Sequence, residues 1–186
     1  LLLIKEQLSS EQSSFVDLET RIASIEKEIA TLEISLEKQA NVLTKNREKA
    51  SPIFKKSIEA LLQQLGLEKA KVEVELTSTK DFGKFGREKI QLLFQANSGF
   101  PLKPIQSAIS GGERSRVMLA VKKIMAENAE LPTLILDEID TGVSGEIAIR
   151  MGEIMKQMSA NMQVFAITHL PQIAAKGDSH FKVAKS

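Results

Sequence analysis

Three short segments of this chain carry residue types that could act on a nucleotide phosphate. In chain order they are Ser110–Glu113, Leu134–Glu138 and Ile167–His169. The first is a glycine-rich turn before a helix, the second is an apolar strand ending in two carboxylates, and the third is an apolar strand ending in a histidine. The sequence Gly-x-x-x-x-Gly-Lys-Ser/Thr does not occur, so the loop that surrounds nucleotide phosphates is absent. The chain therefore carries about half of an ATPase site.

The turn at Ser110–Glu113 can bind an anion. The first N–H groups of a helix have no partner within the helix, and the positive end of the helix dipole attracts phosphate. Gly111 and Gly112 leave this backbone accessible, and the Ser110 hydroxyl adds a donor. Taken alone, the segment is more simply an ordinary turn in which Ser110 caps the helix.

The strand Leu134–Leu136 delivers the carboxylates Asp137 and Glu138. Its uninterrupted apolar run is typical of a buried parallel strand, and ligands bind at the carboxyl ends of such strands. We expect Asp137 to hold Mg²⁺, directly or through water, and Glu138 to polarise the attacking water as general base. The alternative is a solvated pair of loop charges. We expect Asp140 to be structural.

His169 ends the next apolar strand, where its imidazole could hydrogen-bond a transferring phosphoryl oxygen. A lone histidine at a strand end is more often satisfied locally, without a catalytic role. The three segments reinforce one another, because each lies at a strand end or a helix start in the order that one nucleotide site needs.

The composition fits a globular chain and excludes several other classes. Of 186 residues, 42% are hydrophobic and 26% are charged. No apolar stretch approaches the roughly 20 residues that cross a bilayer, and the first residues do not resemble a secretory leader, so we expect the cytoplasm and no membrane partner. Without cysteine, and with only two histidines, a disulfide framework or a protein-built zinc centre is excluded. The net charge of +1 and the absence of Trp and Tyr do not support a large nucleic-acid surface.

Residues 1–50 have the heptad pattern of a coiled-coil strand over about six heptads. Glu and Lys flank the seam, Glu11 and Gln39 interrupt it, and its apolar positions are Leu1, Ile4, Leu8, Phe15, Leu18, Ile22, Ile25, Ile29, Leu32, Leu36 and Leu43. Such a seam needs a partner strand. The alternative is one long amphipathic helix on a globular core. Because Leu1–Leu3 opens the pattern without a cap, we expect the chain to be a fragment of a longer protein.

Residues 51–186 have the pattern of an α/β domain. Ser51 and Pro52 resemble a helix start, which predicts a kink or restart there. Two strands, near Val72–Leu76 and Ile90–Ala96, form a hairpin across the Gly83–Gly86 turn, and a loop follows up to Pro104. Beyond it the pattern predicts a helix, a strand, a helix and a strand. Their predicted ranges are Glu113–Asn128, Thr133–Leu136, Gly145–Met158 and Gln163–Thr168.

At these residues the chain resembles the ABC-type ATPase heads of SMC-like DNA-repair proteins, and most of all the bacterial RecN family. Ser110–Glu113 resembles the signature motif, Leu134–Glu138 the Walker B strand and His169 the switch histidine. The similarity covers roughly residues 94–183. It is most specific in three stretches, which are Ser110–Lys122, Asp137–Gly145 and Thr168–Ala175.

The resemblance implies the C-terminal lobe of an ABC-type, P-loop NTPase head, with an N-terminal lobe that brings the Walker A loop and the outgoing coiled-coil strand. It implies that two heads sandwich ATP and Mg²⁺. Ser110, Gly111, Gly112 and Glu113 would serve the ATP held by the opposing head, with Ser110 and Gly112 on its γ-phosphate. Asp137, Glu138 and His169 would serve the head's own nucleotide. Ser144 departs from the Asp that many relatives carry in this loop, and the family continues past Ser186.

The resemblance also implies a role in recombinational repair of DNA double-strand breaks, on DNA and near the nucleoid. This segment alone is expected to be inactive, because it lacks Walker A. Three alternatives remain: a coiled-coil dimerisation module with an inactive ATPase remnant, another SMC-type chromosome-maintenance ATPase, and an ABC transporter subunit. The long heptad region speaks against the transporter.

Overall fold

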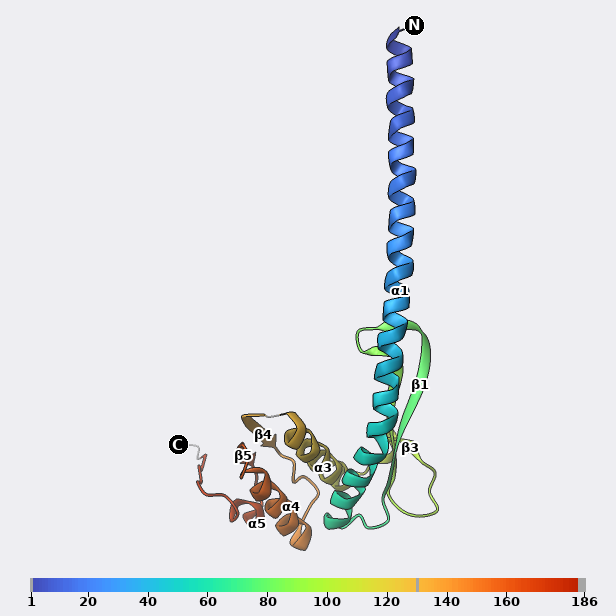
Figure 1. Ribbon diagram of the computed structural model, residues 1–186. Coiled ribbons are helices and arrows are strands. Elements are labelled where there is room, and N and C mark those ends of the chain that lie inside the picture. The colour runs from blue at the N-terminus through green and yellow to red at the C-terminus, as the bar shows by residue number, and fades with distance from the viewer. Residues whose placement is uncertain (1, 130, 184–186) are drawn as a thin grey trace. The chain divides into compact units, whose positions relative to one another are not determined.

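The computed structural model describes the backbone of residues 2–129 and 131–183, and the side chains from residue 16 onward. The chain divides into two compact units (Figure 1). One comprises the chain up to Glu48 together with Lys80–Arg87, and the other comprises Lys49–Thr79 and the chain from Glu88. The three candidate segments all belong to the second unit. No helix in the described part of the chain is long and apolar enough to cross a membrane.

Helix α1, Leu2–Gln64, is continuous over 63 residues, as the heptad pattern predicts for a helix. Its apolar seam is exposed at Leu18, Ile22, Ile25, Ile29, Leu32 and Leu36. The seam positions Leu1, Ile4, Leu8 and Phe15, and the interruption at Glu11, lie outside the described side chains. A row of exposed large apolar side chains along one helix is costly in water, so the seam suits a partner helix. The coiled-coil pairing itself stays a prediction.

The predicted restart at Ser51 and Pro52 is wrong, because α1 continues through both residues. Proline inside a helix costs about 3 kcal/mol, since it removes one hydrogen bond and crowds the preceding turn. The apolar side chains that follow offset this cost, because the next three turns bury Ile58, Leu61, Leu62 and Leu65 in the core. Tertiary packing therefore overrides the local signal.

The end of α1 is fixed by a glycine. Gly66 has φ of 75°, its N–H donates to the Gln63 carbonyl, and the Leu67 N–H donates to the Leu62 carbonyl. This is the Schellman arrangement, in which a left-handed glycine satisfies the last carbonyls of a helix. It turns the chain sharply into the first strand.

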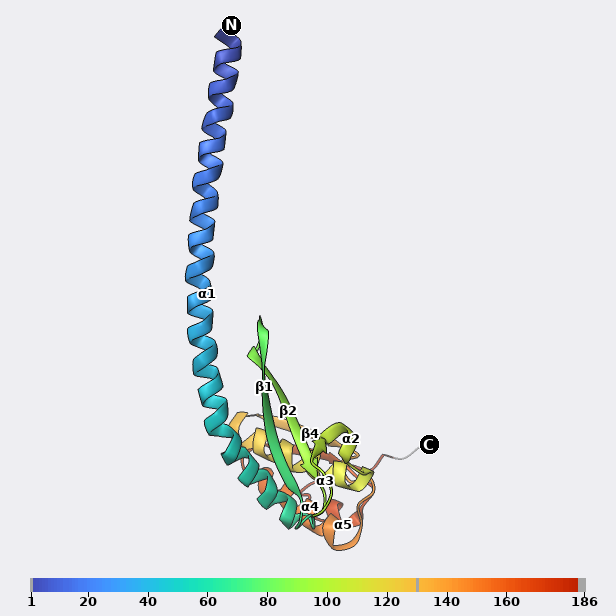
Figure 2. The same ribbon diagram turned by 90° about the vertical axis from the view of Figure 1, so that its right-hand side faces the viewer.

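The first sheet contains β1 (Lys71–Gly83), β2 (Gly86–Gln95) and β3 (Lys103–Pro104), in that order. Figure 2 shows β1 and β2 as the predicted hairpin, and both strands are longer than predicted. Strand β3 pairs antiparallel with β2, with Leu93 opposite Pro104 and Phe94 opposite Lys103. The segment had been expected to be loop throughout, because two residues before a proline carry no strand pattern.

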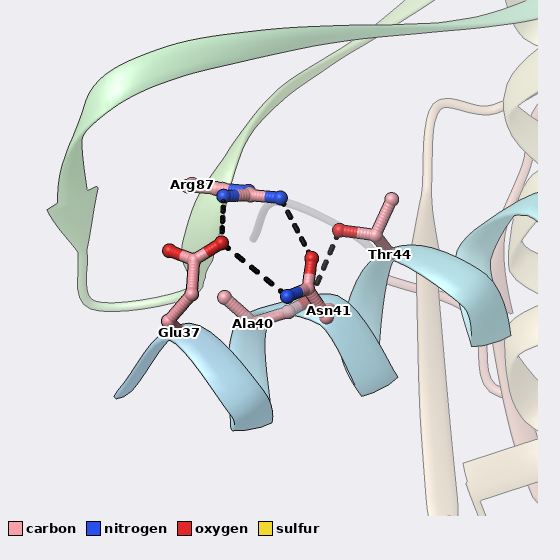
Figure 3. A network of polar contacts seen from close by, with 5 residues as sticks. All are labelled: Glu37, Ala40, Asn41, Thr44 and Arg87. Atoms are coloured by element: carbon pink, nitrogen blue, oxygen red, sulfur yellow. Dashed lines mark hydrogen bonds and ion pairs between the residues drawn. The ribbon is translucent and has the colours of Figure 1, made fainter. Parts of the chain in front are cut away.

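The turn end of this hairpin binds α1 within the first unit (Figure 3). The Arg87 guanidinium donates to Glu37 Oε1 at 2.6 Å and to Asn41 Oδ1 at 2.7 Å, and the Asn41 amide donates to Glu37 Oε1 at 3.3 Å. Arg47 donates to the Phe85 carbonyl. Glu37 and Asn41 are one turn apart and lie on a different helix face from the seam positions Leu36 and Leu43. The hairpin tip therefore leaves the seam uncovered.

We expect Arg87→Ala to loosen the hairpin tip while the chain stays folded. Ion pairs at a solvated surface contribute well under ~1 kcal/mol to stability, so the melting temperature should change little. Amide hydrogen exchange at residues 80–87 should become several-fold faster. The exposed Lys80→Ala is the control, and equal exchange in both variants would contradict the prediction.

The second sheet and its helices have the predicted α/β order. Helix α3 is Gly111–Ala129, β4 is Thr133–Asp137, α4 is Gly145–Met158 and β5 is Gln163–Ile167. Strands β4 and β5 are parallel, with Thr133 opposite Gln163 and Asp137 opposite Ile167. Two short helices were not predicted, α2 (Ile105–Ala108) and α5 (Pro171–Ala174), because each is about one turn long. The chain is thus α/β in the described region.

One face of the β4–β5 sheet is packed and the other is open. Leu136 is buried with Leu119 of α3 and Met151 of α4. On the opposite face, Ile135, Phe165 and Ile167 are 61%, 44% and 56% exposed. Parallel sheets are normally covered on both faces. The open face is therefore a surface that suits further protein.

Candidate nucleotide site

The turn at Ser110 is shaped by a capping contact with Glu113. The Ser110 N–H donates to Glu113 Oε2 at 3.0 Å, and the Arg114 N–H donates to the Ser110 carbonyl at 2.8 Å. This is one half of a capping box. The Glu113 carboxylate is therefore engaged by its own turn, where it stabilises the start of α3. The N–H groups of Gly111 and Gly112 belong to the first turn, where helix geometry leaves them without a carbonyl partner in the helix.

Two contacts hold the first turn of α3 against the loop after β4. A Cβ atom added to Gly112 would lie 2.6 Å from the Gly142 carbonyl oxygen. The buried Ser115 hydroxyl donates to the Thr141 carbonyl at 2.9 Å. Gly142 has φ of 74°, which favours glycine. The glycines at 112 and 142 thus allow the two backbones to meet.

Glu138 has a left-handed backbone, with φ of 47°. The surrounding hydrogen bonds hold it there: its N–H donates to the Ile167 carbonyl at 3.3 Å, and its carbonyl accepts from the Thr141 hydroxyl at 2.9 Å. Left-handed non-glycine residues cost about 1 kcal/mol or more and cluster at functional sites. The side chains of Asp137 and Glu138 are both exposed at the carboxyl end of β4.

The third segment is joined to the second through Asp140. The Asp140 side chain is 1% exposed, and its Oδ2 accepts a hydrogen bond from the Thr168 hydroxyl. His169 Nδ1 lies 3.8 Å from Asp140 Oδ1. The structure therefore connects all three predicted segments: residues 112 and 115 contact residues 141 and 142, and the β4 end contacts residues 167–169. The expectation that Asp140 is structural captured its burial and missed its contacts.

The residues present fit a Mg²⁺ site of the kind found with nucleotides. No cluster of three or more His, Cys, Asp or Glu side chains able to hold a metal occurs among the described residues. Mg²⁺ often takes one or two protein carboxylates and completes its shell with phosphate and water. Asp137, an exposed carboxylate at a strand end, meets that requirement.

Comparison with known proteins gives relatives that share one description. No protein-family model matches the chain. The DNA repair protein RecN of Halalkalibacterium halodurans is 36% identical over 186 residues, which is 98% of this chain and 32% of that protein. RecN of Deinococcus radiodurans is 33% identical over 179 residues, 96% of this chain and 31% of that protein. Over the aligned residues, the chain belongs to the RecN family. It spans about a third of the length of these relatives.

Solved structures agree on the fold. A structure titled for ATP-driven dimerization and DNA stimulated activation of SMC ATPases matches with a TM-score of 0.57 and 19% identity. It covers 79% of this chain and 83% of that one. The Smc head domain of Pyrococcus furiosus with an extended coiled coil matches with a TM-score of 0.59 and 20% identity, over 76% of this chain and 33% of that one. The predicted α/β fold, the C-terminal lobe of an ABC-type head with a long helix, is confirmed.

In this RecN-family chain, Arg116 is a site neighbour whose contacts the sequence does not reveal. Its guanidinium donates from Nε to the Gly112 carbonyl at 3.0 Å and from the NH1 group to the Leu65 carbonyl at 3.1 Å. Burial lowers the pKa of Arg116 from its ordinary value, and the nearby Glu113 opposes that shift. Arginine stays protonated under these conditions. Arg116 therefore ties the end of α1 to the Ser110 turn.

Proposed function

We propose that this chain supplies one half of the nucleotide site of an SMC-like ATPase that acts in recombinational DNA double-strand break repair. The observation that carries the proposal is the contact chain between three separate segments. Gly112 meets Gly142, Ser115 bonds Thr141, and Asp140 bonds Thr168. Residues of the types that phosphoryl transfer uses are thus brought to one end of one sheet, and the relatives are named DNA repair proteins.

In this proposal the roles divide between two heads. Asp137 holds Mg²⁺, which neutralises charge on the phosphates, and Glu138 accepts a proton from the attacking water. His169 donates a hydrogen bond to the transferring phosphoryl group. Ser110, Gly111 and Gly112 face the ATP of the opposing head through the first turn of α3. Glu113 contributes by capping that turn, since its carboxylate already accepts from Ser110.

The missing parts of the site come from the rest of the polypeptide. The open β4–β5 face, at Ile135, Phe165 and Ile167, suits the N-terminal lobe with its Walker A loop. The exposed seam of α1 suits the outgoing coiled-coil strand. DNA as a partner is inferred from the RecN relationship, because a net charge of +1 does not by itself mark a DNA surface.

The test is ATP turnover by this chain alone and by the complete protein. We expect the 186-residue chain to release phosphate from Mg-ATP only at the background rate, because positioning and electrostatics supply nearly all of the catalysis in phosphoryl transfer. The complete protein, or this chain combined with its N-terminal lobe, should turn ATP over.

Two outcomes would overturn the proposal. Turnover by this chain alone at the complete protein's rate would show that the phosphate loop is not needed. A complete protein that neither hydrolyses ATP nor dimerises when ATP is added would favour a structural coiled-coil module with an inactive remnant. Sedimentation with and without a non-hydrolysable ATP analogue measures that dimerisation.

A further inference from the structure

Asp140 is a buried carboxylate with one satisfied oxygen and one unsatisfied oxygen. Its side chain is 1% exposed. Oδ2 accepts from the Thr168 hydroxyl, whereas Oδ1 is buried and has no hydrogen-bond partner among the described residues. Burying an ionised carboxylate costs several kcal/mol unless its oxygens are paired. An unsatisfied buried oxygen therefore calls for a partner that the resting structure does not provide.

The hydrogen-bond directions around Thr168 fix which way this carboxylate faces. The Thr168 hydroxyl oxygen accepts from the Leu170 N–H at 3.0 Å, so its single proton is free to be given to Asp140 Oδ2. Oδ2 is thereby committed to Thr168. The remaining oxygen, Oδ1, is the one that lies 3.8 Å from His169 Nδ1.

The gap to His169 is short enough to close by side-chain rotation. At 3.8 Å the contact is longer than a hydrogen bond. The His169 side chain is 72% exposed, so little packing opposes a turn of the ring. Hydrogen bonds of this kind are often long without ligand and tighten when it binds.

We infer that Asp140 is a positioning residue for His169: Oδ1 accepts the Nδ1–H of the imidazole and sets the orientation in which the ring meets the phosphate. The inference rests on the role of His169 in the proposed ATPase. A ring that donates Nδ1–H to a carboxylate and Nε2–H to a phosphoryl oxygen carries both protons and a positive charge. Asp140 supplies the counter-charge for that state, and Thr168 holds Asp140 in place.

The Asp140→Asn variant tests this contact with almost no change of shape. The Thr168 hydroxyl still needs an acceptor, so the amide oxygen turns to Thr168 and the NH₂ group faces the ring. The ring then meets a donor where it had an acceptor, which favours Nδ1 as the unprotonated nitrogen.

The first measurement is ¹⁵N-histidine NMR on the 186-residue chain at a pH where the rings are neutral. Only His169 and His180 contribute signals. We expect the His169 nitrogens to report more Nδ1–H in the parent than in Asp140→Asn. His180, whose Nε2 is 2.7 Å from the Ala174 carbonyl, should be unchanged and serves as the internal control. Identical His169 nitrogen shifts in parent and variant would overturn the inference, whatever the ATPase result.

The second measurement is a double-mutant cycle on ATP turnover in the complete protein. Removing one donor to a transition state typically costs about 100-fold in kcat, which we expect for His169→Ala. Asp140→Asn should lower kcat by about tenfold with little change in KM, and Thr168→Ser should retain the parent rate because it keeps the hydroxyl.

The double variant, Asp140→Asn with His169→Ala, should be no slower than His169→Ala alone. Fully additive losses would show that Asp140 acts independently of the ring and would overturn the inference. A complete protein without any ATPase activity would contradict the proposed function, and the NMR result would still decide the Asp140 contact.

Discussion

Glu138→Gln is expected to lower ATP turnover by the complete protein about 100-fold or more, with ATP binding retained. A positioned general base contributes roughly 10²- to 10⁴-fold to a rate, and glutamine cannot take the proton of the attacking water. The substitution keeps the length of the side chain. It also leaves the backbone bonds from Ile167 and Thr141 in place, so the left-handed turn should persist. Steady-state kcat and equilibrium binding of a fluorescent ATP analogue separate the two effects.

The matched control is Glu127→Gln near the end of α3. Glu127 pairs with Lys123 on an exposed helix surface and takes no part in the contacts that join the three segments. We expect its turnover to equal that of the parent. Normal turnover by Glu138→Gln would remove Glu138 as general base. An equal loss in both variants would point to a general effect of removing negative charge.

The α/β order was predictable because each element has a simple pattern. Residues 133–137 and 163–167 are short apolar runs, and α4 begins at the predicted Gly145. The differences arise where long-range packing overrides local preference. Pro52 lies inside α1 because the following turns are anchored in the core, and β3 exists only because Phe94 and Leu93 offer a strand edge.

The positions of the candidate residues were predictable, and their contacts were not. Parallel strands bring their carboxyl ends to one edge, which predicts that Glu138 and His169 are neighbours. Nothing in the sequence shows that Asp140 turns inward to Thr168, 28 residues later. The same holds for Gly112, whose need for glycine comes from the approach of Gly142 and not from its own backbone angles.

Gly112→Ala is expected to damage both stability and turnover. The new Cβ would lie 2.6 Å from the Gly142 carbonyl oxygen, a separation that real Cβ atoms do not adopt. Backbone has to move, and such overpacking typically costs about 1–3 kcal/mol. Because α3 and the loop after β4 each carry proposed site residues, separating them also misplaces the site. A misplacement of about 1 Å can cost about 100-fold in rate, so we expect at least a tenfold loss of kcat.

Gly111→Ala separates this steric effect from the general effect of alanine at the start of α3. A Cβ at Gly111 meets no atom within 4 Å, so we expect the free energy of unfolding of this variant, measured by urea denaturation of the 186-residue chain, to stay close to the parent value. Equal stability of Gly112→Ala and Gly111→Ala would contradict the close packing at Gly142. A destabilised Gly112→Ala that keeps full turnover in the complete protein would show instead that the contact supports folding alone. The link between the Ser110 turn and the Asp137–Glu138 strand end would then carry no catalytic consequence.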